Sequence, residues 1–201
     1  MSTTSHSKNI VRKRYFSDKM LLKIYIKFLP MIVFIGGAPG SGKSTLATFL
    51  AAELGLEHLD IEDLSRLHSP QLFGDKAWKN LKQNLRKKLS TKCDLVVTAT
   101  FRKKSTRKKF FDIAKWRDKK IIALFLMPDS DIVITRASRR NPDHYDVNAQ
   151  NAREIISNWY KKFMDEDRSN IGYKNNSPWL IIDNEKMKNG EILQIVKERL
   201  G

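Results

Sequence analysis

Residues 36–45, GGAPGSGKST, combine glycine, lysine and hydroxyl side chains at the spacing of a phosphate-binding loop. Gly37, four further residues, and then glycine, lysine and serine match that pattern in full. Glycines allow a tight turn whose backbone N–H groups point inward. Lys43 can reach the β- and γ-phosphates of a nucleotide, and the Ser44 hydroxyl is a hard oxygen ligand of the kind that Mg²⁺ prefers. The sequence therefore predicts binding of ATP or a similar nucleotide together with Mg²⁺. The predicted nucleotide-binding residues are Gly37, Ala38, Pro39, Gly40, Ser41, Gly42, Lys43, Ser44 and Thr45, and Ser44 is also the predicted metal ligand.

A second polar cluster lies at residues 60–66, where Asp60, Glu62 and Asp63 precede Arg66. Asp63 and Arg66 are three residues apart, so on a helical turn they would share a face. A carboxylate there could accept the proton of an attacking hydroxyl, and the arginine could hold an anionic acceptor with its two-pronged guanidinium. The same spacing also fits an ordinary surface ion pair, and spacing alone leaves both interpretations open.

A phosphate-binding loop needs a strand before it and a helix after it, and the sequence predicts both. MIVFIG over residues 31–36 is a continuous apolar run, as expected of a strand buried in a parallel sheet. Residues 44–55 repeat apolar side chains at helical spacing and end at Gly55. The positive end of that helix would add to the attraction for phosphate.

The alternation of strands and helices continues to the end of the chain. Further strands are predicted at residues 57–61, 93–100, 121–127 and 179–183. Helices are predicted at residues 76–89, 105–116, 130–139, 147–164 and 187–200. This order predicts the α/β fold class, with a five-stranded parallel sheet between two layers of helices.

The length of 201 residues fits one domain. That domain is predicted to span residues 31–201, after a basic extension at residues 1–30. The single cysteine, Cys93, excludes an internal disulfide and is interpreted as a buried thiol, so a reducing, cytoplasmic setting is expected. No apolar stretch approaches the ~20 residues that span a membrane.

Positive charge is concentrated in two segments of a chain whose formal net charge is +16. Residues 1–30 carry seven Lys/Arg and one Asp, and residues 102–120 carry ten Lys/Arg and two Asp. Such a concentration can attract a polyanion such as nucleic acid. It also fits solvated, lysine-rich faces, and the composition leaves both interpretations open.

The order of these motifs resembles small P-loop kinases, in particular the polynucleotide-kinase-like and zeta-toxin-like group. The resemblance rests on GAPGSGKST, on the D-x-x-R spacing of Asp63 and Arg66, on the apolar run that ends in TATF, and on the basic segment at residues 134–147. It covers roughly residues 31–200. It implies a P-loop NTPase fold of the nucleoside-kinase-like type, with the first strand at the centre of the sheet.

The resemblance also implies roles for individual residues. Asp63 would act as general base on the acceptor hydroxyl, and Arg66 would bind the acceptor. Residues 134–147 resemble the group's lid, whose arginines clamp the phosphates during transfer. Arg107 falls where the group often has an arginine at the start of a helix. The arginines at the lid positions are Arg136, Arg139 and Arg140.

One position departs from the pattern of that group. Relatives usually have an aspartate at or next to position 98, where it helps to hold Mg²⁺, its waters or the acceptor. This chain has threonine, alanine, threonine and phenylalanine over residues 98–101. Asp60, Glu62 and Asp63 are the candidates to compensate for the missing carboxylate.

Two functions are consistent with these features. In the first, the chain is an ATP-dependent kinase in which Lys43 and the lid arginines neutralise the charge that develops on the transferred phosphoryl group. The charge asymmetry favours a polynucleotide 5′-hydroxyl as acceptor, with a nucleotide sugar or a small metabolite as the alternative. In the second, the chain binds nucleotide and nucleic acid without transferring phosphate, as the missing aspartate and the basic extension would allow.

Overall fold

A five-stranded parallel sheet forms the centre of the computed structural model, which describes residues 31–61, 83–88, 94–115, 120–139, 150–167 and 178–200. The strands are β1 (Met31–Gly37), β2 (Glu57–Asp60), β3 (Leu95–Thr98), β4 (Lys120–Leu126) and β5 (Trp179–Ile182). They lie in the order β2-β3-β1-β4-β5, and every neighbouring pair is parallel. The resemblance's implication that the first strand is central is confirmed, because β1 lies third of five.

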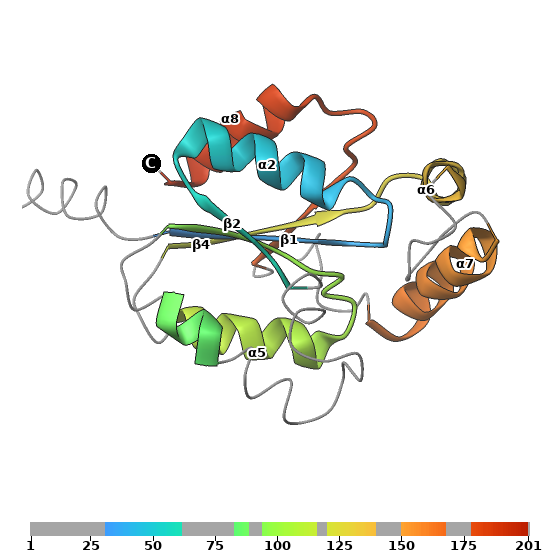
Figure 1. Ribbon diagram of the computed structural model, residues 1–201, viewed down its shortest axis with the longest axis horizontal. Helices are drawn as coiled ribbons and strands as arrows, with labels where there is room; N and C mark the ends of the chain where they lie inside the picture. The colour runs from blue at the N-terminus through green and yellow to red at the C-terminus, as the bar shows by residue number, and fades with distance from the viewer. Residues whose placement is uncertain are drawn as a thin grey trace, which may run out of the picture.

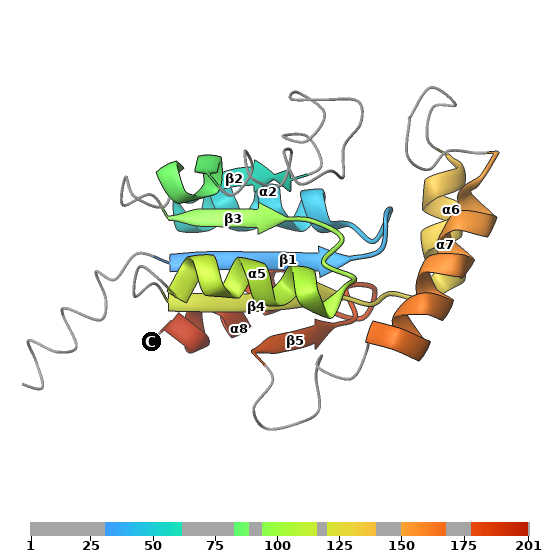
Figure 2. The same cartoon turned by 90° about the horizontal axis from the view of Figure 1, so that it is seen from below.

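Helices cover both faces of this sheet. Figure 1 shows α2 (Lys43–Leu54) and α8 (Asn189–Leu200) on one face and α5 (Lys104–Lys115) on the other. Figure 2 shows that α6 (Ser130–Ser138) and α7 (Ala152–Lys162) lie beyond the carboxyl ends of the strands. Ligands of open α/β sheets bind at that edge. The pair α6–α7 therefore borders the edge of the sheet where a ligand is expected.

The central strand is apolar throughout because each of its faces meets a separate core. Ile32 and Phe34 pack into a cluster on the α5 side, whereas Val33 and Ile35 pack on the α2 and α8 side. All four side chains are at most 1% exposed. Burial on both faces explains why the strand reads as a continuous hydrophobic run rather than as an alternating one.

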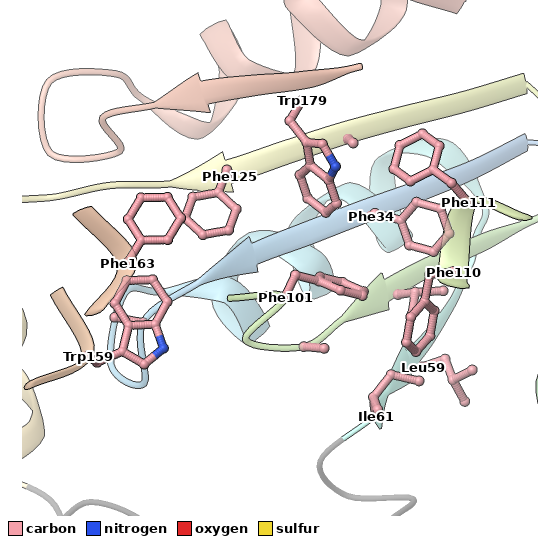
Figure 3. Close-up of a cluster of buried hydrophobic side chains, with 14 of the residues drawn as sticks. Phe34, Leu59, Ile61, Phe101, Phe110, Phe111, Phe125, Trp159, Phe163 and Trp179 are labelled. Atoms are coloured by element: carbon pink, nitrogen blue, oxygen red, sulfur yellow. The ribbon is translucent and has the colours of Figure 1, made fainter. Parts of the chain in front are cut away.

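The core on the α5 side is rich in aromatic rings (Figure 3). Phe34 meets Phe101 edge to face, with 5.7 Å between the ring centroids. Near the carboxyl ends of the strands, Phe163 stacks on Phe125 and on Trp159, at centroid distances of 4.8 and 5.2 Å. These rings join α7 to the sheet, so they fix the helices that border the carboxyl edge.

The predicted alternation of strands and helices is confirmed over the described residues. The predicted helix at residues 147–164 is the one that differs most, because α7 spans Ala152–Lys162 and the chain then continues as a π-helix, η1 (Phe163–Asp167). Of the helix predicted at 76–89, residues 83–88 are described and are helical. The predicted extension at 1–30 and Cys93 lie outside the described residues.

Within the part of the chain that the structure describes, none of the helices combines the length and the apolar character needed to cross a membrane.

Candidate functional site

The phosphate loop connects β1 to α2 at the middle of the sheet's carboxyl edge. Gly40 and Gly42 adopt φ angles of 87° and 93°, a left-handed region that suits glycine. The Ser41 N–H donates to the Ala38 carbonyl at 3.1 Å, which closes the tight turn. Gly42 is the N-cap of α2, so the loop ends at the positive end of that helix, where an anion would be favoured.

The side chain of Lys43 lies over the loop. Its side chain is only 6% exposed, and Nζ donates to the Ala38 carbonyl oxygen at 2.9 Å. The ammonium therefore bends back across the loop whose N–H groups are to hold phosphate. A buried positive charge at the N-terminus of a helix is a strong attractor for an anion.

Two other parts of the chain form the walls of the loop. A Cβ atom built on Gly40 would lie 3.3 Å from the Val133 carbonyl oxygen, so α6 packs directly against the loop backbone. Asn184, in the turn after β5, donates from Nδ2 to the Ser41 carbonyl at 2.9 Å. In the described structure, the Ser41 hydroxyl and the Asn184 carboxamide oxygen are buried without a hydrogen-bond partner. The loop is therefore held by α6 on one side and by Asn184 on the other.

A carboxylate at the end of β2 meets Ser44. The Ser44 hydroxyl lies 3.5 Å from Asp60 Oδ2, and the Thr98 hydroxyl donates to the same oxygen at 2.9 Å. His58 Nε2 lies 3.1 Å from the Thr98 hydroxyl. Thr98 is fully buried, so its hydroxyl is held between the other two side chains.

Ser44 and Asp60 provide oxygen donors that suit Mg²⁺. A serine hydroxyl and a carboxylate are hard ligands, and Mg²⁺ in nucleotide sites uses one or two such groups together with phosphate oxygens and water. Among the described residues, no group of three or more His, Cys, Asp or Glu side chains could hold a metal ion without other ligands. The donor set therefore fits a metal that arrives with a nucleotide.

Of the three predicted lid arginines, two lie in the described residues. Arg136 is in the last turn of α6, where Nη2 lies 2.6 Å from Glu185 Oε1. Arg139 is the C-terminal cap of α6 and is exposed. Arg140 lies outside the described residues. The structure thus places Arg136 next to the phosphate loop, but in an ion pair with the turn after β5.

The base of α6 is joined to α7 by a partly buried hydroxyl. Tyr160 donates to the Pro128 carbonyl at 2.7 Å. Burial, with smaller contributions from Asp129 and Asp183, raises the pKa of Tyr160 well above its ordinary value of 10.0. The hydrogen bond from Lys186 holds the pKa of Asp183 below its ordinary range. The β4–α6 turn and the turn after β5 therefore both carry carboxylates near Tyr160.

Arg107 has a structural position in α5. Its side chain is 3% exposed, and Nη1 donates to the carbonyl oxygens of Phe101, at 2.9 Å, and of Arg102. Phe101 is the one described non-glycine residue with a positive φ, at 44°. The guanidinium therefore fixes the turn between β3 and α5 from inside.

The predicted general base and acceptor-binding arginine, Asp63 and Arg66, lie outside the described residues, as does Glu62. Their roles stay predictions. The sequence did not indicate His58, Thr98 as a hydrogen-bonding partner, or Asn184 as part of the site. Nothing in the spacing pointed to the contact of Thr98 with Asp60 or to that of Asn184 with Ser41, because both depend on which segments the fold brings together.

The exposed basic side chains of residues 102–115 lie on α5 and in the turn before it. Lys103, Lys104, Lys108, Lys109 and Lys115 are exposed, while the opposite side of the helix is buried in the core. Lys108 pairs with Asp112 at 2.9 Å. This arrangement is compatible with both interpretations of the charge, a polyanion surface and a solvated face.

Comparisons with known proteins support the same fold. A family model described as an AAA domain matches residues 32–161, which is more than half of the chain. No curated protein matches this chain. A gluconokinase from Sinorhizobium meliloti 1021 is similar in structure, with 16% identity and a TM-score of 0.58 over 86% of this chain and 92% of that one.

Two further solved structures are similar at comparable levels. A sugar kinase from Janibacter sp. HTCC2649 has 17% identity and a TM-score of 0.57, and the match covers 85% of this chain and 94% of that one. A shikimate kinase from Acinetobacter baumannii, in complex with shikimate, has 20% identity and a TM-score of 0.54, with 85% and 92% covered. At these identities the likeness establishes the α/β fold of the chain.

Proposed function

As the chain belongs to the AAA domain family, we propose that it is an ATP-dependent kinase that transfers the γ-phosphoryl group to a hydroxyl acceptor. The observation that carries this proposal is the phosphate loop. Its glycines hold left-handed conformations, Lys43 lies buried over it, and α2 begins directly after it. These features give a nucleotide's phosphates backbone donors, a cation and a helix N-terminus at one place.

The acceptor is proposed to be a small hydroxylated molecule. A gluconokinase, a sugar kinase and a shikimate kinase have the same fold over most of this chain. Each of those names describes a kinase that acts on a small molecule with free hydroxyl groups. Fold alone does not set the substrate, so the identity of the acceptor depends on the carboxyl edge of this chain.

A polynucleotide 5′-hydroxyl is the second candidate acceptor, favoured by the exposed lysines of α5. Lys103 and Lys104 lie where β3 passes into α5, at the carboxyl edge of the sheet. Contacts between such lysines and phosphates would make oligonucleotide binding fall steeply with salt. A nucleotide-dependent nucleic-acid-binding protein without transfer activity would show the same salt dependence.

The proposed mechanism divides the reaction among the residues named above. The acceptor oxygen attacks the γ-phosphorus, the bond from that phosphorus to the bridging oxygen breaks, and ADP leaves. Asp63 takes the acceptor's proton, and Arg66 holds the acceptor. Ser44 would hold the Mg²⁺ that binds together with ATP, and this ion would neutralise part of the phosphate charge. Most of the rate enhancement then comes from positioning and electrostatics.

Two positive groups would act on the transferred phosphoryl group. Lys43 lies over the loop and would contact the β- and γ-phosphates once a nucleotide replaces its contact with Ala38. The lid arginines would approach from α6, which already packs on Gly40. The proposed lid arginines are Arg136, Arg139 and Arg140. Charge from both sides favours the transition state, in which negative charge spreads over the phosphoryl oxygens.

Transfer of the labelled γ-phosphate of ATP, with Mg²⁺ present, tests the proposal. The acceptors are gluconate, shikimate, a panel of sugars and a 5′-hydroxyl oligonucleotide. We expect the wild-type protein to label one class of acceptor and Lys43→Ala to label none. Lys197→Ala is the matched control, because Lys197 lies on the exposed face of α8. Labelled oligonucleotide alone would establish the second candidate, and bound ATP with no transfer to any acceptor would refute the kinase.

A further inference from the structure

Asp60 ends β2 beside the hydroxyl that is to hold the metal. Its Oδ2 lies 3.5 Å from Ser44 Oγ, although the two residues are 16 positions apart. Ser44 is the second residue of α2 and is exposed at the loop. Asp60 is half-buried, and its carboxylate lies between the hydroxyls of Ser44 and Thr98.

A directed chain of hydrogen bonds positions this carboxylate. Thr98 donates its only hydroxyl proton to Asp60 Oδ2 at 2.9 Å. His58 Nε2, 3.1 Å from the same hydroxyl, must therefore donate to Thr98 rather than accept from it. The order of donation is His58 to Thr98 to Asp60.

The strand register explains why β2 can place a carboxylate at this point. Asp60 and Thr98 are register partners in the parallel pair β2–β3. The resemblance described above places an aspartate at or next to position 98, and this chain has threonine there. Moving the carboxylate from position 98 to its register partner keeps it at the same edge of the sheet. The threonine that remains then becomes a donor that holds the moved carboxylate.

We propose that Asp60 is the metal-side carboxylate of this site, positioned by Thr98 and reaching Mg²⁺ or its bound waters next to Ser44. This inference rests on the proposed function, because it assigns a residue to the metal that accompanies ATP. Carboxylates that accept from metal-bound waters typically change metal affinity by ~10–100-fold when removed. Without metal, the same carboxylate repels the nucleotide's phosphates, so it makes nucleotide binding depend on Mg²⁺.

Binding of a non-hydrolysable ATP analogue, β,γ-imido ATP, measures that dependence without turnover. Calorimetric titrations in Mg²⁺ and in a metal chelator give two dissociation constants, and their ratio is the metal–nucleotide coupling. Asp60→Asn keeps the size and the acceptor oxygen but removes the charge. We expect it to reduce the coupling about tenfold or more, with weaker binding in Mg²⁺ and equal or tighter binding in the chelator. Asp112→Asn, on the exposed face of α5, is the matched control.

Two further variants separate a direct metal role from a structural one. Thr98→Val keeps the side-chain shape and removes only the donor, and we expect a smaller loss of coupling than in Asp60→Asn. The double variant Asp60→Asn with Thr98→Asp returns a carboxylate to position 98, and we expect it to recover coupling relative to Asp60→Asn alone. Thermal unfolding of each variant checks that it is folded. Titration of Mn²⁺ into the analogue complex, followed by electron paramagnetic resonance, gives metal affinity directly.

The outcomes distinguish this inference from the proposed function. Unchanged coupling and Mn²⁺ affinity in folded Asp60→Asn would overturn the role of Asp60 while leaving the kinase intact. Coupling that falls in Asp60→Asn, in a protein that transfers phosphate to no acceptor, would support the metal role and refute the kinase. Wild-type protein that bound the analogue equally well with and without Mg²⁺ would overturn the inference, because there would be no coupling to lose.

Discussion

Arg136 on α6 and Glu185 in the turn after β5 form an ion pair, with 2.6 Å between Nη2 and Oε1. The pair joins two segments that contact the phosphate loop, because α6 packs on Gly40 while Asn184, next to Glu185, binds the Ser41 carbonyl. The arginine proposed to clamp phosphates is thus paired with a carboxylate in this structure. In the proposed mechanism, Arg136 would exchange this contact for one with the nucleotide's phosphates.

Glu185→Gln is expected to tighten ATP binding by about threefold, the size of a partly exposed ion pair. The change releases Arg136 and removes one negative charge near the loop. Calorimetric titration with ATP in the presence of Mg²⁺ measures the dissociation constant of each protein. Glu198→Gln removes the same charge from the exposed face of α8 and should leave the affinity unchanged. Weaker binding in Glu185→Gln would show instead that Glu185 supports the bound nucleotide.

Gly42→Ala is expected to destabilise the fold by about 1–3 kcal/mol and to weaken ATP binding. Gly42 has a φ of 93°, and a Cβ there would lie 2.9 Å from Asn184 Nδ2, which holds the loop. Gly190→Ala is the matched control, because a Cβ at that position in α8 meets nothing within 4 Å. The control should not lose stability and should gain less than about 1 kcal/mol, because Gly190 lies in the first turn of α8 rather than in its interior. Urea unfolding of both variants gives the comparison, and equal stability would contradict the assigned strain.

Arg107→Ala is expected to lower the free energy of unfolding by about 2–3 kcal/mol. The substitution leaves the buried carbonyl of Phe101 without its donor and frees a turn whose φ of 44° is held in place. Lys108→Ala, one residue later and 76% exposed, should change stability by less than about 0.5 kcal/mol. Denaturant unfolding measures both. A stability loss as small as that of the control would mean that the turn does not need the guanidinium.

Tyr160→Phe should be less stable than wild type near neutral pH by about 1 kcal/mol, since it loses the hydrogen bond to Pro128. The raised pKa means that the folded protein keeps the phenol proton at pH values where the unfolded chain loses it. The contribution of Tyr160 is therefore complete below its ordinary pKa of 10.0 and declines as pH rises above it. Urea unfolding across alkaline pH should show the gap between the two proteins narrowing. A constant gap would contradict the burial of the hydroxyl.

Local sequence determined the elements and the phosphate loop of this protein. The apolar run of β1, the glycines and lysine that follow, and the helical spacing of α2 each signal their structure within a few residues. The position of β1 at the centre of the sheet was predicted from a family resemblance, because hydrophobic periodicity does not specify strand order. The start of α7 was predicted five residues too early, since polar residues before Asn151 do not mark a helix boundary.

Tertiary structure alone decided which side chains meet around the loop. Asn184 reaches Ser41 across 143 residues, and Thr98 reaches Asp60 across 38. Neither contact has a spacing signal, because each depends on which strands are neighbours and on where each strand ends. In a parallel sheet the carboxyl ends of all strands face the same edge. The sequence therefore determines which residues stand at that edge, while strand order and register determine which of them touch.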